Sequence, residues 1–235
     1  MEILLILIPT ALGLSFLFGA DSGSDGDNST EADALLAAES AQTEEEATAP
    51  YYGADGDPLT GDSLNDLING TSGDDMMLGR VGDDTLDGGD GSDTISGGGG
   101  IDSILGGSMA DSLDGNGGND FVSGESGNDT INGGEGDDSL VAGTGEDVVD
   151  GGADNDTING GAGDDILAGG EGADLIVANE GNDTLLGNAG ADTLSGSDTD
   201  DVIIAGFGKD TVEGGAGNDT IFGGNADLRG LISGG

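Results

Sequence analysis

Apolar residues return every nine residues through most of the chain, and most have at least one more polar neighbour. The series runs from Leu59 to Ile221 and has nineteen positions. One apolar residue between outward-facing neighbours is the alternation of a short β-strand with one buried side chain. Nine residues are enough for one such strand and one tight turn, and repeats of this size must stack to bury a continuous core. The pattern therefore predicts an all-β solenoid.

An aspartate precedes every one of these apolar residues by two positions. Nineteen consecutive steps of nine residues land on aspartate, and one further step in either direction lands on Thr48 or Leu228. Glycine stands two residues before the aspartate in 14 of the 19 repeats and five residues before it in 15. Glycine adopts positive φ and allows close backbone approach, as a tight turn requires. This fixed phase argues against disorder, which the composition alone would suggest.

The consensus Gly-Gly-x-Gly-x-Asp-x-apolar-x is seen cleanly at residues 160–167 and 214–221. It resembles the calcium-binding nonapeptide of the RTX (hemolysin-type) family, and the resemblance extends from Asp57 to about Phe222. The resemblance implies a parallel β-roll with two nonapeptides per turn, in which six residues form a calcium-binding turn and three form the strand. We therefore expect a roll of about nine turns over residues 53–224, roughly 45 Å long at the spacing of β-strands.

By the same resemblance, each aspartate of the array binds calcium through its side chain, and the turn glycines offer backbone carbonyls. The main candidate ligands are Asp75, Asp84, Asp93, Asp102, Asp120, Asp129, Asp138, Asp147, Asp165, Asp174, Asp183, Asp192, Asp210 and Asp219. Weaker candidates have another residue in place of the glycine two positions earlier, and they are Asp57, Asp66, Asp111, Asp156 and Asp201. For any single member the alternative is an ordinary acidic turn residue.

Charge restricts the function further. The 235 residues carry a formal net charge of −46 and only three basic side chains, which excludes nucleic acid as a partner. Histidine and cysteine are absent, so the chain has no histidine-based zinc site, catalytic triad or disulfide. We expect no enzymatic activity, since residues 21–52 are too few for a catalytic domain.

Stacking the repeats two per turn places alternate aspartates on opposite edges, with seventeen gaps between them. Carboxylates about 4.8 Å apart repel by roughly 0.9 kcal/mol even in water, or about 15 kcal/mol over all gaps. That equals the whole stability of a typical domain, so the metal-free roll should not be stable. Oxygen ligands suit Ca²⁺ better than Mg²⁺, and up to about 17 ions would fill the gaps. Calcium binding and folding should then be one event.

The two ends differ from the array. Residues 3–20 are apolar and uncharged, and we expect a helical membrane anchor over residues 1–20, with an atypical signal peptide or a packing segment as alternatives. Residues 21–52 are acidic and of low complexity, and they predict a solvated linker. Residues 225–235 lose the repeat and predict a degenerate cap or tail.

Outward-facing apolar residues stack on successive turns at Ala168, Leu186, Ile204 and Phe222. They reflect either strand propensity and cover by the N-terminal segment, or a docking surface for a partner or a second copy.

The sequence therefore predicts a calcium-binding protein that folds with calcium and has a structural or interaction role outside the cell or at its surface. Extracellular calcium is concentrated enough to fill weak sites. The alternatives are an export or folding module related to secreted enzymes, and an adhesin or ice-binding roll.

Overall fold

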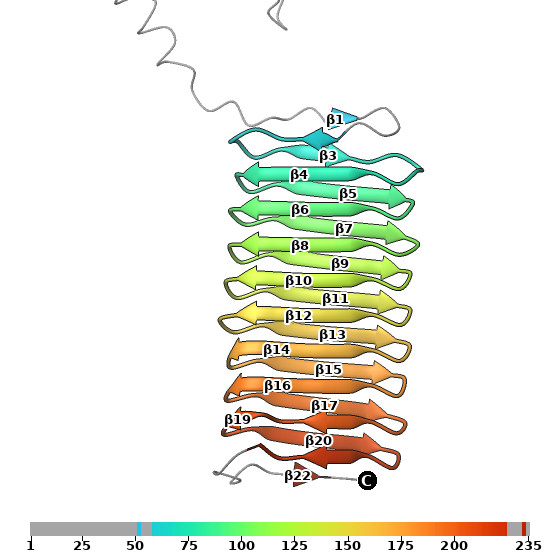
Figure 1. The fold of residues 1–235 in the computed structure, drawn as a ribbon, viewed down its shortest axis with the longest axis vertical. Helices are drawn as coiled ribbons and strands as arrows, with labels where there is room; N and C mark the ends of the chain where they lie inside the picture. Colours follow the sequence, from blue (N-terminus) through green and yellow to red (C-terminus); the bar gives the residue numbers. More distant parts are fainter. Residues whose placement is uncertain (1–50, 53–57, 225–231, 234–235) are drawn as a thin grey trace, which may run out of the picture. The chain divides into compact units, whose positions relative to one another are not determined.

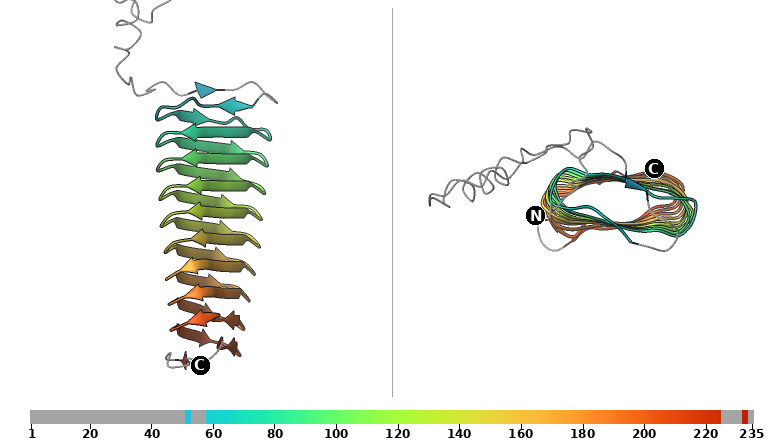
Figure 2. Two further views of the ribbon diagram at one scale, coloured as in Figure 1. Left: turned by 60° about the vertical axis from the view of Figure 1, so that its left-hand side comes forward. Right: turned by 90° about the horizontal axis from the view of Figure 1, so that it is seen from above.

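Two parallel β-sheets make up the computed structural model, which describes residues 51–52, 58–224 and 232–233. The chain passes back and forth between the sheets, so that odd-numbered strands build one sheet and even-numbered strands the other (Figure 1). Seen from above, the turns of the roll lie over one another as a flattened oval whose long sides are the two sheets (Figure 2). The predicted all-β parallel solenoid of about nine turns is confirmed.

The strands are short and similar in length. The first sheet contains β1 (Tyr51–Tyr52), β3 (Leu67–Asn69), β5 (Thr85–Asp90), β7 (Ser103–Ser108), β9 (Phe121–Ser126), β11 (Ser139–Thr144), β13 (Thr157–Ala162), β15 (Leu175–Glu180), β17 (Thr193–Asp198), β20 (Thr211–Ala216) and β22 (Ile232–Ser233). The second sheet contains β2 (Leu59–Thr60), β4 (Met76–Val81), β6 (Thr94–Gly99), β8 (Ser112–Gly117), β10 (Thr130–Glu135), β12 (Val148–Ala153), β14 (Ile166–Gly172), β16 (Thr184–Gly190), β18 (Val202–Ile204) and β21 (Thr220–Phe222), and β19 (Phe207–Gly208) also pairs with β16.

Neighbouring strands pair in register at a separation of 18 residues. Ile131 of β10 lies beside Leu113 of β8 on one side and Val149 of β12 on the other. Two nine-residue repeats therefore complete one turn, as the sequence predicts, and equivalent residues form columns that run along the roll.

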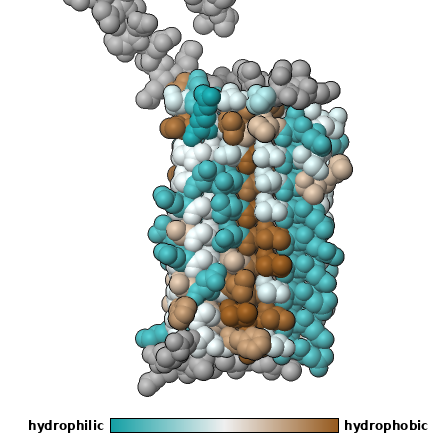
Figure 3. All heavy atoms as spheres, viewed as in Figure 1, coloured by the Kyte–Doolittle hydropathy of each residue, from teal (hydrophilic) through white to brown (hydrophobic). Residues whose placement is uncertain are grey.

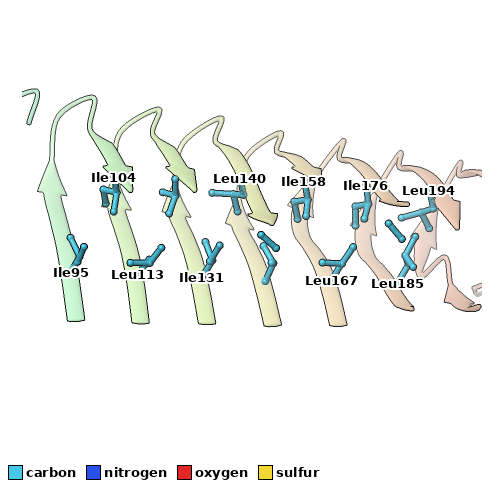
Figure 4. Close-up of a cluster of buried hydrophobic side chains, with 14 of the residues drawn as sticks. Ile95, Ile104, Leu113, Ile131, Leu140, Ile158, Leu167, Ile176, Leu185 and Leu194 are labelled. Atoms are coloured by element: carbon cyan, nitrogen blue, oxygen red, sulfur yellow. The ribbon is translucent and has the colours of Figure 1, made fainter. Parts of the chain in front are cut away.

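The core is a double column of single apolar side chains, one from each repeat (Figure 4). From Leu59 to Val212 these residues are almost fully buried, while the residues before and after them face outward or are only partly covered. The inward orientation predicted for this position is confirmed. Full burial of one Ile or Leu side chain contributes about 1.5–3 kcal/mol, and only stacked repeats provide the walls that make such burial complete.

The strands are longer than the family resemblance implied. β5 covers Thr85–Asp90, and only Gly91, Ser92 and Asp93 separate it from β6. Six residues therefore form the strand and three the corner, because the ladder continues past the glycines through Gly89 and Asp90, which pair with Gly107 and Ser108. The expectation of a three-residue strand was wrong.

Two short strands lie outside the expected limits of the roll. β1 extends the first sheet before β3, and β22 extends it after β20. The expected helix over residues 3–20 and most of the linker lie outside the described residues. Among those that are described, no helix has the length and apolar character needed to cross a membrane.

Candidate metal centre

The array aspartates lie inside the corners of the roll rather than on its surface. From Asp75 to Asp201, fifteen consecutive members are at most 5 % exposed. Asp66, Asp210 and Asp219 are partly buried, and Asp57 lies outside the described residues. Burying a carboxylate is costly unless it is paired, so the partners of each oxygen decide what the site can do.

One oxygen of each carboxylate from Asp84 to Asp219 is satisfied by the backbone of the preceding turn. Oδ1 of Asp138 accepts a hydrogen bond of 2.8 Å from the N–H of Asp120, and Oδ1 of Asp156 accepts one of 2.9 Å from the N–H of Asp138. The same bond recurs eight times along each edge, from Asp66 to Asp210 and from Asp75 to Asp219, at 2.7–3.2 Å. We call these two columns the inner ladders. They confirm the predicted stacking of alternate aspartates on opposite edges.

The second oxygen of the inner aspartates has no hydrogen-bond partner, although it is buried. This holds for Oδ2 of Asp84, Asp93, Asp102, Asp111, Asp120, Asp129, Asp138, Asp147, Asp156, Asp165, Asp174, Asp183, Asp192, Asp201 and Asp219. An unsatisfied buried acceptor costs about 1–3 kcal/mol, and more when it is charged. Fifteen such oxygens in one small roll require a positively charged or proton-bearing partner.

In most repeats glycine keeps a space open beside the unpartnered oxygen, whereas Ala142 and Ala178 occupy this position before Asp147 and Asp183. A Cβ atom built on Gly115 would lie 2.6 Å from Oδ2 of Asp120 and 2.6 Å from the carbonyl oxygen of Gly133, which belongs to the next turn. A carboxylate oxygen and a backbone carbonyl oxygen therefore converge on the same glycine. The neighbouring repeats have the same arrangement, in which the glycine five residues before the aspartate faces its Oδ2.

The first two described aspartates differ from the rest. Oδ2 of Asp66 accepts the N–H of Asp62 at 2.8 Å, and Oδ2 of Asp75 accepts both the N–H and the hydroxyl of Thr71 at 2.6 and 2.9 Å. Most later repeats have a glycine with positive φ at the position of Asp62 and Thr71. Protein donors thus satisfy Oδ2 of the first two described aspartates, and the repeat consensus contains no signal for either hydrogen bond.

Three aspartates expected to form weaker sites have the same geometry as the others. Asp111, Asp156 and Asp201 are buried, and each has an unpartnered Oδ2. The residues that replace the corner glycine there, Met109, Asp154 and Thr199, adopt φ of 79°, 77° and 72°. Such a conformation costs a non-glycine residue about 1–2 kcal/mol. The substitutions therefore strain the corner without displacing the aspartate.

Burial raises the pKa of the inner aspartates. It raises the pKa of Asp102, Asp120 and Asp138 from 3.8 to about 6, against the opposing effect of the backbone hydrogen bond to Oδ1. For Asp129 and Asp156 it raises the pKa to about 7. Repulsion between neighbouring carboxylates acts in the same direction but is smaller than the effect of burial. The sequence analysis attributes the cost of the metal-free roll to repulsion between carboxylates, whereas in the structure burial is the larger effect on their pKa.

Carboxylates alone do not form a metal site. Within the described part of the chain, no three acidic side chains converge closely enough to hold an ion. The available donors are instead one unpartnered carboxylate oxygen per repeat and nearby backbone carbonyl oxygens. Calcium accepts six to eight oxygen ligands in flexible geometry, including backbone carbonyls, whereas Mg²⁺ requires near-octahedral geometry and keeps its waters. The donor set therefore fits calcium.

A second column of polar side chains lies on the outside of the corners. The residue just before the array aspartate accepts the N–H of the residue 18 positions later, as Asp137 does from Asn155 at 2.9 Å. We call these columns the outer ladders, and their acceptors include Asn65, Asp74, Asp83, Asn119, Asn128, Asp137, Asn155, Asp164 and Asp200. The sequence analysis missed them, although Asn or Asp recurs at this position with the same period of nine.

The outer carboxylates behave oppositely to the inner ones. Asp137 and Asp200 are exposed, and hydrogen bonds from the backbone and side chain of Asn155 and Asn218 lower their pKa. They are satisfied by protein donors and do not need a cation.

A family model described as RTX calcium-binding nonapeptide repeat (4 copies) matches the chain in overlapping segments. They cover residues 51–86, 60–95, 69–104, 96–131, 105–140, 132–167, 141–176, 159–194, 168–203 and 195–227. No curated protein matches the chain.

Proposed function

We propose, since the chain belongs to the RTX calcium-binding nonapeptide repeat family, that calcium fills the inner ladders and that the roll folds only when they are filled. The repeats of this family imply calcium binding in a β-roll. The ligands, the number of ions and the biological role in this chain are our proposals.

The observation that carries the proposal is the unpartnered Oδ2 of the inner aspartates. Each is a buried carboxylate oxygen, and in most repeats it converges with the carbonyl oxygen of another turn. A divalent cation between turns would satisfy both atoms and would offset the cost of burying the charge. The array from Asp84 to Asp201, together with Asp219, supplies the side-chain ligands in this proposal.

The stoichiometry should be close to one ion per gap, with up to about 17 ions in all. Sixteen gaps carry the Oδ1 hydrogen bond in the described residues, eight on each edge. Oδ2 of Asp66 and Asp75 already has protein donors, so we expect the first gaps to bind calcium most weakly.

The role that we propose is structural and extracellular. The chain would act as a rod that calcium stabilises, and it would have no enzymatic activity. It would lie outside the cell or on its surface, where calcium is concentrated enough to fill weak sites. Residues 3–20 are apolar enough to tether the rod to a membrane. The inward-facing carboxylates support this role, since they are available to an ion inside the corner rather than to a substrate at the surface.

A calcium titration of the metal-free chain tests the proposal. Far-UV circular dichroism should change cooperatively from coil to β-structure, and isothermal titration calorimetry should count many ions that bind over the same range. Magnesium at equal concentration should leave the chain unfolded. Full β-structure without metal, together with no calcium uptake, would refute the proposal.

A further inference from the structure

One part of the second sheet faces outward with apolar side chains. The outward positions of β14, β16, β18 and β21 form two columns, because the strands pair in register. In one column Leu186, Ile204 and Phe222 stack directly after Ala168. Ile204 is 38 % exposed and Phe222 54 % exposed. Figure 3 shows this sheet, with brown residues gathered toward its lower end.

Acidic side chains are absent from these outward columns. Across β14, β16, β18 and β21, the residues one and three positions after the array aspartate are Ile, Ala, Thr, Leu, Val or Phe. Nearer the N-terminus, outside this region, acidic residues do occur at the outward positions of the same sheet, with Asp150 on β12 and Asp114 on β8. In a chain of net charge −46, these two columns are a region where another copy could approach without meeting a carboxylate, and the nearest one on these strands is the exposed Glu171, beside Ala189 in the next outward column.

We propose that a second copy of this chain packs against this face. The two copies would be related by a two-fold axis that is parallel to the strands and lies between β16 and β18. β14 of each copy then lies over β21 of the other, and β16 lies over β18. The two rolls point in opposite directions and overlap only in their last four rows.

Shape complementarity supports this register. The two-fold axis places the large Phe222 over the small Ala168 of the other copy, and Ile166 over Thr220. The central rows place Thr184 over Val202. Large residues therefore face small ones at both ends of the contact, as packed sheets require.

A third pair of positions fits the same axis. Phe207 is 65 % exposed, and its neighbour on β16 is the exposed residue Ala189. Because the axis exchanges β16 with the row of β18 and β19, Phe207 of one copy lies over Ala189 of the other. A side chain that projects from the roll thus meets a position with room for it.

A parallel arrangement of the two copies is less favourable. An axis along the roll would also set large residues against small ones, but the sheets would face each other along their whole length. Asp150 would then be buried against Val148 of the other copy, without a positive partner. Such a charge opposes association, whereas the antiparallel register leaves β12 beyond the contact.

The contact area predicts a weak and reversible dimer. Four rows at about 4.8 Å and six residues at about 3.3 Å give roughly 380 Å² per copy, or about 760 Å² in total. Stable interfaces usually bury at least about 1,200 Å². The dimer should therefore depend on protein concentration.

Sedimentation of the full chain in saturating calcium tests the dimer. Ile166→Asp should raise the dimer dissociation constant about tenfold or more, because it buries a charge in the contact. Leu175→Asp is the matched control, since Leu175 occupies the equivalent position on the other sheet and is 41 % exposed against 46 % for Ile166. It should leave the dissociation constant unchanged. Equal effects of the two variants would overturn the proposal.

A size exchange tests the register. Ala168→Phe alone should weaken the dimer about tenfold by a clash with Phe222, and the double variant Ala168→Phe/Phe222→Ala should recover most of the loss. The parallel arrangement places Ala168 opposite Ile166 and predicts no recovery. Failure of the double variant to recover would rule out the antiparallel register.

Mixed cysteine variants provide an independent test, since the chain has no cysteine of its own. Ile166→Cys and Thr220→Cys should form a disulfide only when the two variants are mixed, because equal positions lie three rows apart in the dimer. Circular dichroism of every sample separates this inference from the calcium proposal. A chain that stays unfolded in calcium refutes the calcium proposal. A chain that folds but is monomeric and does not cross-link refutes only the dimer, and would leave this face to a different partner.

Discussion

Asp137 and Asp138 are neighbours in sequence but lie in opposite environments. Asp137 belongs to an outer ladder and is exposed, and Asn155 donates to it from both backbone and side chain. Asp138 belongs to an inner ladder, and its Oδ2 is buried without a partner. The pKa of Asp137 is lowered by these hydrogen bonds, whereas burial raises the pKa of Asp138 to about 6.

This difference shows that acidic composition alone does not locate a metal site. Both ladders are rich in acidic residues and both connect successive turns. Only the inner ladder leaves an anionic oxygen without a donor, so only the inner ladder needs a cation. The predictions below separate the two ladders.

Lowering the pH should stabilise the metal-free roll and so partly substitute for calcium. This is the largest effect that we expect. Burial raises the pKa of Asp129, Asp156 and Asp165 from 3.8 to about 7 in the folded roll. The folded state then binds protons more tightly than the unfolded chain, so the metal-free roll gains stability as pH falls from about 7 toward 4. That stability is lost as pH rises through the folded pKa.

The metal-free chain should therefore show more β-structure by circular dichroism at pH 5 than at pH 7.5. The outer carboxylates Asp137 and Asp200 have the opposite sign, because a lowered pKa contributes stability that is present above the unfolded pKa. A metal-free chain that is equally unfolded at both pH values would contradict the dominance of the inner ladders.

Asp138→Asn should weaken calcium binding, while Asp137→Asn should not. The inner variant keeps an oxygen for the N–H of Asp120 but loses the anionic oxygen, so the loss is chemical rather than structural. We expect it to lower the free energy of unfolding in calcium by about 2 kcal/mol and to remove at least one ion in calorimetry. The outer variant introduces a residue that Asn119 and Asn155 already provide in the same ladder. Equal losses in the two variants would show that both ladders bind calcium.

Replacing Thr199 with glycine should stabilise the roll. Thr199 has φ of 72°, which is unfavourable for a β-branched residue, and most repeats have glycine at this position. We expect thermal unfolding in calcium to show a gain of about 1 kcal/mol. Thr193→Gly in strand β17 is the control, and it should lose stability instead. A loss in the Thr199 variant would mean that its hydroxyl matters more than the backbone strain.

Asn155→Ala should have the smallest effect. Its side chain accepts the N–H of Ala173 and donates to Asp137, and both bonds are exposed to solvent. We expect a loss of about 0.5–1 kcal/mol by thermal unfolding and an unchanged calcium count. A change in the count would connect the outer ladder to the metal site.

Sequence periodicity predicted the parts of this fold that depend on position alone. The step of nine identified the buried column from Leu59 to Val212, and pairing at 18 residues followed from the two repeats per turn that the family resemblance implies. These features are recoverable because each repeat obeys the same alternation of inward and outward side chains.

Features that depend on individual atoms could not be predicted in this way. The sequence does not show that Oδ1 of Asp120 receives a backbone N–H while its Oδ2 receives none. Likewise, Thr71 closes the site at Asp75 through a local hydrogen bond that no repeat consensus contains. The recurrence of Asn and Asp before the array aspartate did indicate the outer ladder. It did not identify the hydrogen bond, because Asn and Asp occur in turns for several different reasons.

The hydrogen bonds of the inner ladder all point the same way along the chain. The N–H of an aspartate is always the donor, and the carboxylate that accepts it lies 18 residues later. If the roll folds from its N-terminus, the aspartate N–H of each new turn has no carboxylate acceptor until the following turn is in place. The roll therefore has a polarity, because each turn is completed by the chain on its C-terminal side.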